Sequence, residues 1–107
     1  MNNFVISVAN SFSPSPAGRH KGDGPFPGEV FRDSLLIPAL RSNESVTVDF
    51  DGTEACGSSF LDEAFGGLIR QGGFTEQALR KILHFRASRK SYEAKVWKYI
   101  HEAGLAS

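Results

Sequence analysis

The sequence lacks several features that would assign a protein to a broad class at once. It has one cysteine among 107 residues, which excludes an internal disulfide framework and favours a reducing compartment. It has no apolar run approaching the roughly 20 residues that span a bilayer, and its first residues lack the basic and apolar regions of a signal peptide. It also carries no net charge. We therefore expect a cytoplasmic protein that does not use a membrane.

The composition that remains is ordinary for a globular protein, and the length predicts one domain over residues 1–107. Nine phenylalanines stand against one tryptophan and two tyrosines, so we expect phenylalanine rings to fill the core. Charge is unevenly distributed. Residues 1–66 carry nine acidic and four basic side chains, whereas residues 67–107 carry three acidic and eight basic side chains. This polarity either steers a charged partner or is cancelled by ion pairs between the two parts.

Three segments have the alternating pattern of β-strands. Phe4, Ile6 and Val8 alternate with residues that are also largely apolar, which predicts a strand covered on both faces. Residues 46–50 alternate up to Asp51-Gly52, a strong turn signal, and residues 83–87 form a shorter third strand.

Four helices are expected between and after these strands. One begins at residue 29 and should kink or end at Pro38, because proline removes a donor and clashes with the preceding turn. The clearest covers residues 58–70, where Ser59 and Asp62 form a start resembling a capping box. Two further helices cover residues 75–81 and the segment from residue 90. Strands alternating with helices predict an α/β fold with a mixed or parallel central sheet of three to four strands, flanked by helices.

The segment at about residues 10–28 is rich in serine, proline and glycine and is too long for an ordinary connection. We predict a long loop there, and we expect it to cover the region of Ser58.

The richest chemistry lies where the second strand meets the 58–70 helix. The strand ends in acidic side chains, the chain turns, and the helix opens with Gly57-Ser58-Ser59. This arrangement resembles the STAS-like family of unknown function, a relative of the bacterial anti-sigma-factor antagonists. The match covers roughly residues 15–70, and the residues that carry it lie at 28–33, 35–36, 48–52 and 58–63.

The resemblance implies a small STAS-like sandwich that serves as a bacterial regulatory protein and binds protein partners. In the antagonists, a serine at this helix start is phosphorylated by a kinase-like ATPase, which switches partner binding. By position Ser58 is the candidate phosphoacceptor, with Ser59 beside it. The antagonists usually have an acidic residue just before the serine pair, where this sequence has Gly57.

Physical chemistry leaves two roles open for the serine pair. A phosphate at a helix N-terminus meets free backbone N–H groups and the positive end of the helix dipole. Alternatively, Ser58 or Ser59 simply caps the helix. In the first case the surrounding residues are the candidate partner-binding surface, and they are Asp49, Asp51, Gly57, Asp62 and Glu63.

Other candidates are weaker. Cys56 precedes a helix start, where a thiol can become reactive, but a lone cysteine is more often a small buried residue. The acidic cluster could bind Mg²⁺, yet turn chemistry also explains it. The three histidines are scattered and predict no zinc site. We therefore expect no metal, no cofactor and no catalytic constellation.

The alternative function is a nucleic-acid-binding accessory protein. Basic side chains alternate with aromatic ones in the last third of the chain, as in some nucleic-acid-binding surfaces. An amphipathic helix explains the same pattern, and the neutral net charge favours it. The candidate contact residues are Arg86, Arg89, Lys90, Lys95 and Lys98.

Overall fold

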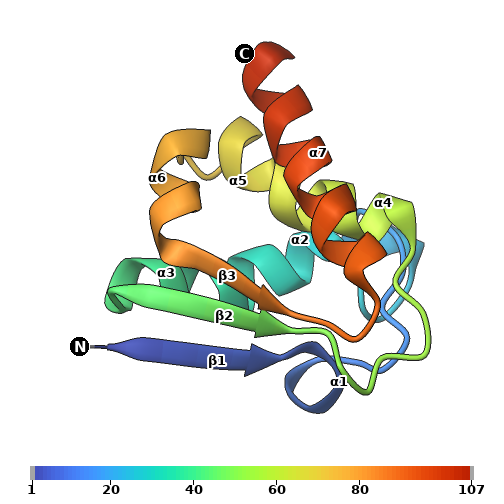
Figure 1. Cartoon of the computed structure of the whole chain (residues 1–107). Helices are drawn as coiled ribbons and strands as arrows, with labels where there is room; N and C mark the ends of the chain where they lie inside the picture. Colours follow the sequence, from blue (N-terminus) through green and yellow to red (C-terminus); the bar gives the residue numbers. More distant parts are fainter. Residues whose placement is uncertain (1, 107) are drawn as a thin grey trace.

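The computed structural model describes residues 2–106 and contains one parallel sheet of three strands (Figure 1). The strands are β1 (Asn3–Ser7), β2 (Ser45–Asp49) and β3 (Leu83–Arg86), in the order β1-β2-β3. Val5 lies opposite Thr47 in the first pair, and Thr47 lies opposite His84 in the second. The predicted α/β fold is confirmed, and the sheet is parallel throughout rather than mixed.

Two long helices follow β1 and β2, and each contains a π-helical section. The elements of the first are α2 (Gly28–Phe31), π-helical η2 (Arg32–Leu36) and α3 (Ile37–Ser42). Those of the second are α4 (Ser58–Leu61), π-helical η3 (Asp62–Gly66) and α5 (Gly67–Arg70). The remaining elements are α1 (Val8–Ser11), the 3-10 turn η1 (Lys21–Asp23), α6 (Glu76–Ile82) and α7 (Lys90–Ala106).

Pro38 does not end the first helix, which continues to Ser42. In a regular α-helix its ring would meet the carbonyl group four residues earlier. Here the preceding turn is widened: the Ile37 N–H donates to the carbonyl of Arg32, five residues back. The widened turn makes room for the proline, and the helix continues past it.

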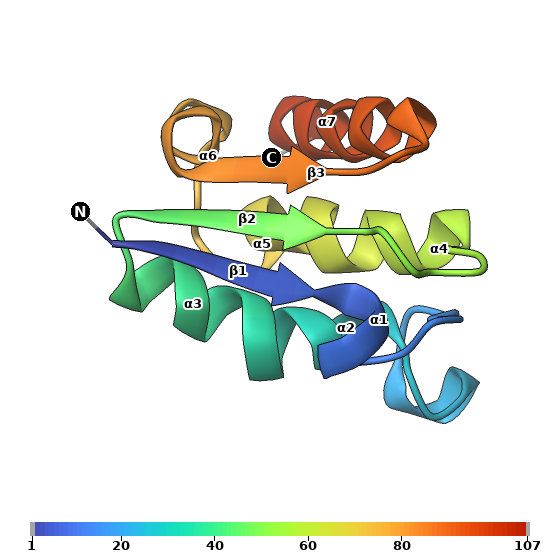
Figure 2. The same ribbon diagram turned by 60° about the horizontal axis from the view of Figure 1, so that its bottom comes forward.

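The long helices and α7 all lie on one face of the sheet (Figure 2). The prediction that the first strand is covered on both faces is therefore wrong. Val5, on the open face, is 42% exposed, and Phe4, on the helix-bearing face of this edge strand, is 48% exposed. The open face also carries the polar residues Thr47, opposite Val5, and His84, opposite Thr47, and polar side chains need no cover from water.

The core lies between the sheet and the helices and is rich in phenylalanine, as expected. Phe31, Phe60 and Phe65 are fully buried, and Phe50 is 2% exposed. The second long helix presents an apolar stripe to the core: Phe60, Leu61, Ala64, Phe65 and Leu68 are fully buried, and Ile69 is partly buried. This packing fixes which face of the helix, and therefore which of its polar residues, points away from the sheet.

Candidate functional site

The connections that follow the three strands gather at the carboxyl edge of the sheet, where α4 also begins (Figure 2). Open α/β sheets bind their ligands at this edge. Glu54 donates its backbone N–H to the Pro14 carbonyl at 2.7 Å, which joins the connection after β2 to the loop after β1. Asp49 ends β2, Asp51 and Gly57 lie in the segment that leads from it into α4, and Ser58 is the first residue of α4.

The serine pair does not cap its helix. The N-cap is Gly57, whose backbone is extended with φ −65° and ψ 149°, and Ser58 is the first helical residue. No side chain caps this end, so the capping role considered for Ser58 and Ser59 is wrong. Both serines are exposed, and neither hydroxyl group has a hydrogen-bond partner among residues 2–106. The hydroxyls are open to a modifying enzyme or a partner.

Asp62 makes ion pairs instead of closing a capping box. Its Oδ2 accepts a hydrogen bond of 2.6 Å from Nη1 of Arg19, and its Oδ1 accepts one of 3.3 Å from Nη1 of Arg70. Arg19 belongs to residues 12–27, which hold no regular element except η1. The loop thus reaches the helix one turn beyond Ser58, close to where we expected it to lie. Arg19 was not among the predicted site residues, because nothing local marks it as a partner of a residue 43 positions away.

Glu63 is buried and faces the first long helix. Its Oε2 lies 2.7 Å from Nη1 of Arg32, and each of these two side chains is only 6% exposed. The same Nη1 also donates to the Glu63 carbonyl oxygen at 2.9 Å. Glu63 therefore joins the two long helices and has almost no surface to offer a partner.

Asp49 and Asp51 hold the connections at the carboxyl edge together. Asp51 accepts hydrogen bonds of 2.8 Å from both the backbone N–H and the hydroxyl of Ser88, in the connection after β3. The hydrogen bonds from Ser88 lower the pKa of Asp51 below its ordinary value. Asp49 accepts a bond of 3.4 Å from Nη1 of Arg86 on the neighbouring strand. A cavity of about 160 Å³ lies beside Asp51 and reaches Tyr92.

Replacing Asp51 with asparagine is expected to lower stability at neutral pH, because the amide loses the charge that strengthens the bonds to Ser88. A carboxyl group whose folded pKa is depressed contributes stability above its unfolded pKa and loses it as the pH falls through the folded value. Urea unfolding of both forms checks this. The difference in midpoint should shrink as the pH falls below 3.8, the ordinary pKa of this group. A difference that stays constant with pH would contradict the assignment.

Cys56 does not have the features of a reactive thiol. It is buried, and burial raises its pKa to about 11 despite a hydrogen bond with Thr53 that acts in the opposite direction. The thiol is therefore protonated at neutral pH and a poor nucleophile. No cluster of three or more His, Cys, Asp or Glu side chains within the described part of the chain is arranged to hold a metal ion.

The five basic candidate residues are spread over β3, the connection that follows it and α7. Arg86 is directed toward Asp49, whereas Lys95 and Lys98 lie on the exposed side of α7. Trp97 is covered on its ring face by the guanidinium group of Arg80, 4.1 Å from the ring centroid. Because one face is occupied and the ring also packs against the core, this ring is not presented for stacking on a base. No observation favours a nucleic-acid-binding surface.

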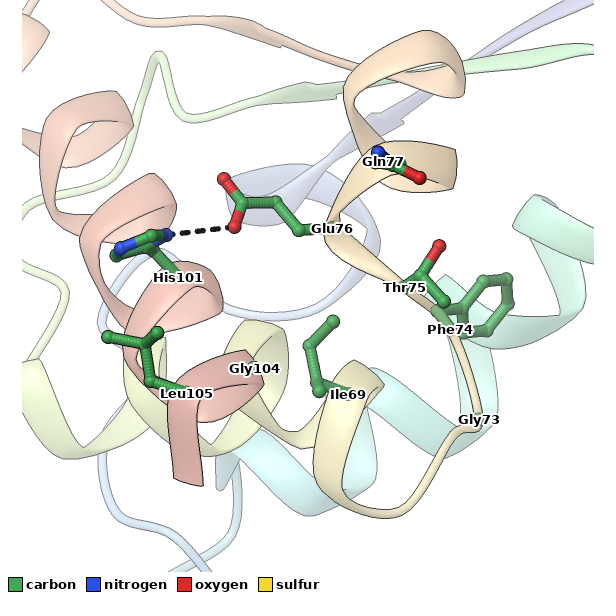
Figure 3. A pocket seen from close by; sticks show the side chains of 9 residues that line it. All are labelled: Ile69, Gly73, Phe74, Thr75, Glu76, Gln77, His101, Gly104 and Leu105. Atoms are coloured by element: carbon green, nitrogen blue, oxygen red, sulfur yellow. Dashed lines mark hydrogen bonds and ion pairs between the residues drawn. The ribbon is translucent and has the colours of Figure 1, made fainter. Parts of the chain in front are cut away.

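A groove of about 450 Å³ lies between α5, α6 and the end of α7, and the sequence analysis did not predict it (Figure 3). Ile69, Phe74 and Leu105 supply its apolar lining, and His101 Nδ1 lies 2.9 Å from Oε1 of Glu76. His101 and then Arg80 lower the pKa of Glu76. This pair joins α6 to α7 and shares no residue with the carboxyl edge.

These features define an α/β domain whose polar side chains at the carboxyl edge mostly hold its connections together. A family model described as a STAS-like domain of unknown function matches residues 27–93, and the chain belongs to that family. The match begins at residue 27 rather than near residue 15, and it continues past residue 70 to include β3 and the start of α7. STAS-like domains often mediate protein interactions, which suggests a regulatory or interaction role.

Searches of the curated proteins and of the solved structures find no match. No helix within residues 2–106 is long and apolar enough to cross a membrane.

Proposed function

We propose that this protein is a non-catalytic, cytoplasmic bacterial regulator that docks onto a protein partner through the start of α4. Docking is controlled by phosphorylation of Ser58, and the kinase is a partner of the kinase-like ATPase type. Asp49, Asp51, Gly57 and Asp62 supply the surface around the phosphoacceptor.

One observation carries the proposal: the Ser58 hydroxyl is exposed and has no intramolecular partner among the described residues. A serine that capped the helix would hold its oxygen on a backbone N–H group, whereas this one is presented to solvent. The N–H groups of the first helical turn have no intrahelical acceptor, so they favour an added phosphate of about −1.5 to −2 charge. The modification would change the local surface charge without unfolding the helix.

The surroundings of Ser58 support a change in binding on modification. Ser58 and Asp62 are four residues apart, so their side chains are neighbours on the same helix face. Asp62 is held by Arg19 and Arg70. A phosphate on Ser58 would add negative charge beside one carboxylate and two guanidinium groups, and a partner that fits the unmodified surface would lose that fit.

Intact-mass analysis of the chain purified from its native cells tests this proposal. We expect a mass increase equal to one phosphate, which disappears in Ser58→Ala and persists in the matched control Ser59→Ala. Affinity capture with the unmodified and the phosphorylated protein should then retain a partner in only one of the two forms. An unmodified mass under all growth conditions would contradict the phosphorylation step, and the absence of any captured protein would contradict the docking role.

A further inference from the structure

The outer edge of β1 has no neighbouring strand among residues 2–106, because β1 is the first strand in the order β1-β2-β3. The Ser45 N–H donates to the Asn2 carbonyl at 3.0 Å, and successive residues of a strand direct their backbone groups to opposite sides. The backbone groups of Asn3 and Val5 therefore point outward, together with the Ser7 N–H. Ser7 is also the N-cap of α1, so its carbonyl accepts the first hydrogen bond of that helix. Phe4 and Val5 are also two of the four exposed large hydrophobic residues in the described chain.

This edge lacks the features that prevent edge-to-edge pairing. Such edges usually carry charged side chains, a proline or a bulge. β1 has none of these, and the first charged residue of the sequence is Arg19. The opposite edge differs, because β3 contains His84 and Arg86 and is followed closely by Arg89 and Lys90. Charged side chains thus protect the β3 edge but not the β1 edge, and of these two edges only that of β1 is open to pairing.

The residue pattern of β1 indicates what pairs with it. Asn3-Phe4-Val5-Ile6-Ser7 is polar at both ends and apolar in the middle, so it reads the same in both directions. In an antiparallel pair centred on Val5, Asn3 lies opposite the second copy's Ser7, and Phe4 lies opposite its Ile6. The two Val5 residues would then form a hydrogen-bonded pair and exchange two N–H···O bonds. Each Ser7 N–H would donate to the second copy's Asn3 carbonyl, which leaves the Ser7 carbonyl to α1.

We propose that β1 is a self-association surface, on which two copies of the chain pair antiparallel through Val5 and form a six-stranded sheet about a two-fold axis. Charge does not oppose a second copy here, because both strands are uncharged and approach without repulsion. Two copies joined through β3 would bring Arg86 and its neighbours against the same cations. The dimer is closed, because the free β1 edge of each copy is used up by the other copy. The proposal does not depend on phosphorylation of Ser58, which lies on another element.

Light scattering coupled to size-exclusion chromatography, over a concentration series of the full chain, tests the proposal. We expect twice the mass of one chain. Val5→Pro removes an outward N–H that does not bond to β2, and edge strands tolerate proline. This variant should therefore have the mass of one chain and an unchanged far-UV circular dichroism spectrum. The matched control Val5→Thr keeps both the N–H and the branched side chain and should remain a dimer.

A single-chain mass for the unaltered protein at millimolar concentration would overturn the proposal, and so would a folded Val5→Pro variant that remains a dimer. If Val5→Pro fails to fold, amide hydrogen exchange of the unaltered chain decides. Protection of the Val5 amide comparable to that of Phe4 supports pairing. Rapid exchange of the Val5 amide, together with slow exchange of the Phe4 amide, overturns the self-pairing proposal. Protection of Val5 that appears only with another protein assigns the edge to that protein, and self-pairing is then wrong.

Discussion

Replacing Arg32 with methionine is expected to destabilise the protein by about 3–5 kcal/mol, because it leaves a buried carboxylate without its partner. Arg32 and Glu63 are 2.7 Å apart, and each side chain is 6% exposed. Methionine preserves most of the volume, so the loss reports the missing charge rather than a cavity. Arg19 lies 4.0 Å from Glu63 but is already bound to Asp62, so it replaces Arg32 poorly. Urea unfolding of the two forms measures the change.

Two controls separate the buried pair from its exposed neighbour. Changing both Arg32 and Glu63 to methionine should restore most of the lost stability, because replacing a buried pair with apolar side chains is often neutral or stabilising. Asp33→Ala removes an ion-pair partner of Arg32 that is 55% exposed, so it should cost at most about 1 kcal/mol. The interpretation would be wrong if Arg32→Met were as stable as the unaltered chain, or if the double variant were the least stable.

Replacing Gly28 with alanine is expected to destabilise the protein by about 1–3 kcal/mol, although alanine favours a helix. A Cβ atom at this position would lie 2.6 Å from the Phe60 carbonyl oxygen and 2.9 Å from the Ala64 backbone nitrogen. Both atoms are backbone atoms of the other long helix, so no side chain can rotate away. The two helices would have to separate, and packing would be lost along their contact.

The matched control is Gly22→Ala, because no atom lies within 4 Å of the Cβ that would be added there. Its free energy of unfolding should stay within about 0.5 kcal/mol of the unaltered chain. Both variants can be compared by urea unfolding monitored by circular dichroism. A Gly28→Ala variant as stable as the Gly22→Ala control would show that the helices are not held together as closely as the structure indicates.

Local periodicity was sufficient to predict the strands and the second long helix. The apolar stripe from Phe60 to Leu68 recurs at helical spacing, and burial of that stripe against the sheet follows directly. The predicted bounds of that helix, residues 58–70, agree with the structure, but its predicted cap was wrong. Ser59 followed by Asp62 is a capping pattern, but the Asp62 carboxylate forms ion pairs with two arginines instead of accepting from a backbone N–H. The N-cap is Gly57.

Polar residues were the least predictable part of the candidate site. Asp62 and Glu63 are adjacent acidic residues in the first turns of one helix, and the sequence offers no reason to treat them differently. In the fold, Asp62 is 22% exposed at its side chain, whereas Glu63 is 6% exposed and paired with Arg32, 31 residues earlier. Serines 58 and 59 were recognised as notable, but their lack of any intramolecular partner required the folded structure.

The sequence by itself determined the order of strands and helices, the α/β class and the position of the Ser58-Ser59 helix start. These depend on hydrophobic periodicity and on turn residues, which act over a few neighbouring positions. Only the tertiary structure decided that one face and one edge of the sheet stay open, that Glu63 is buried and that Arg19 reaches Asp62. Those outcomes depend on which distant segments pack together, and a charged or apolar side chain does not specify its partner within its own local pattern.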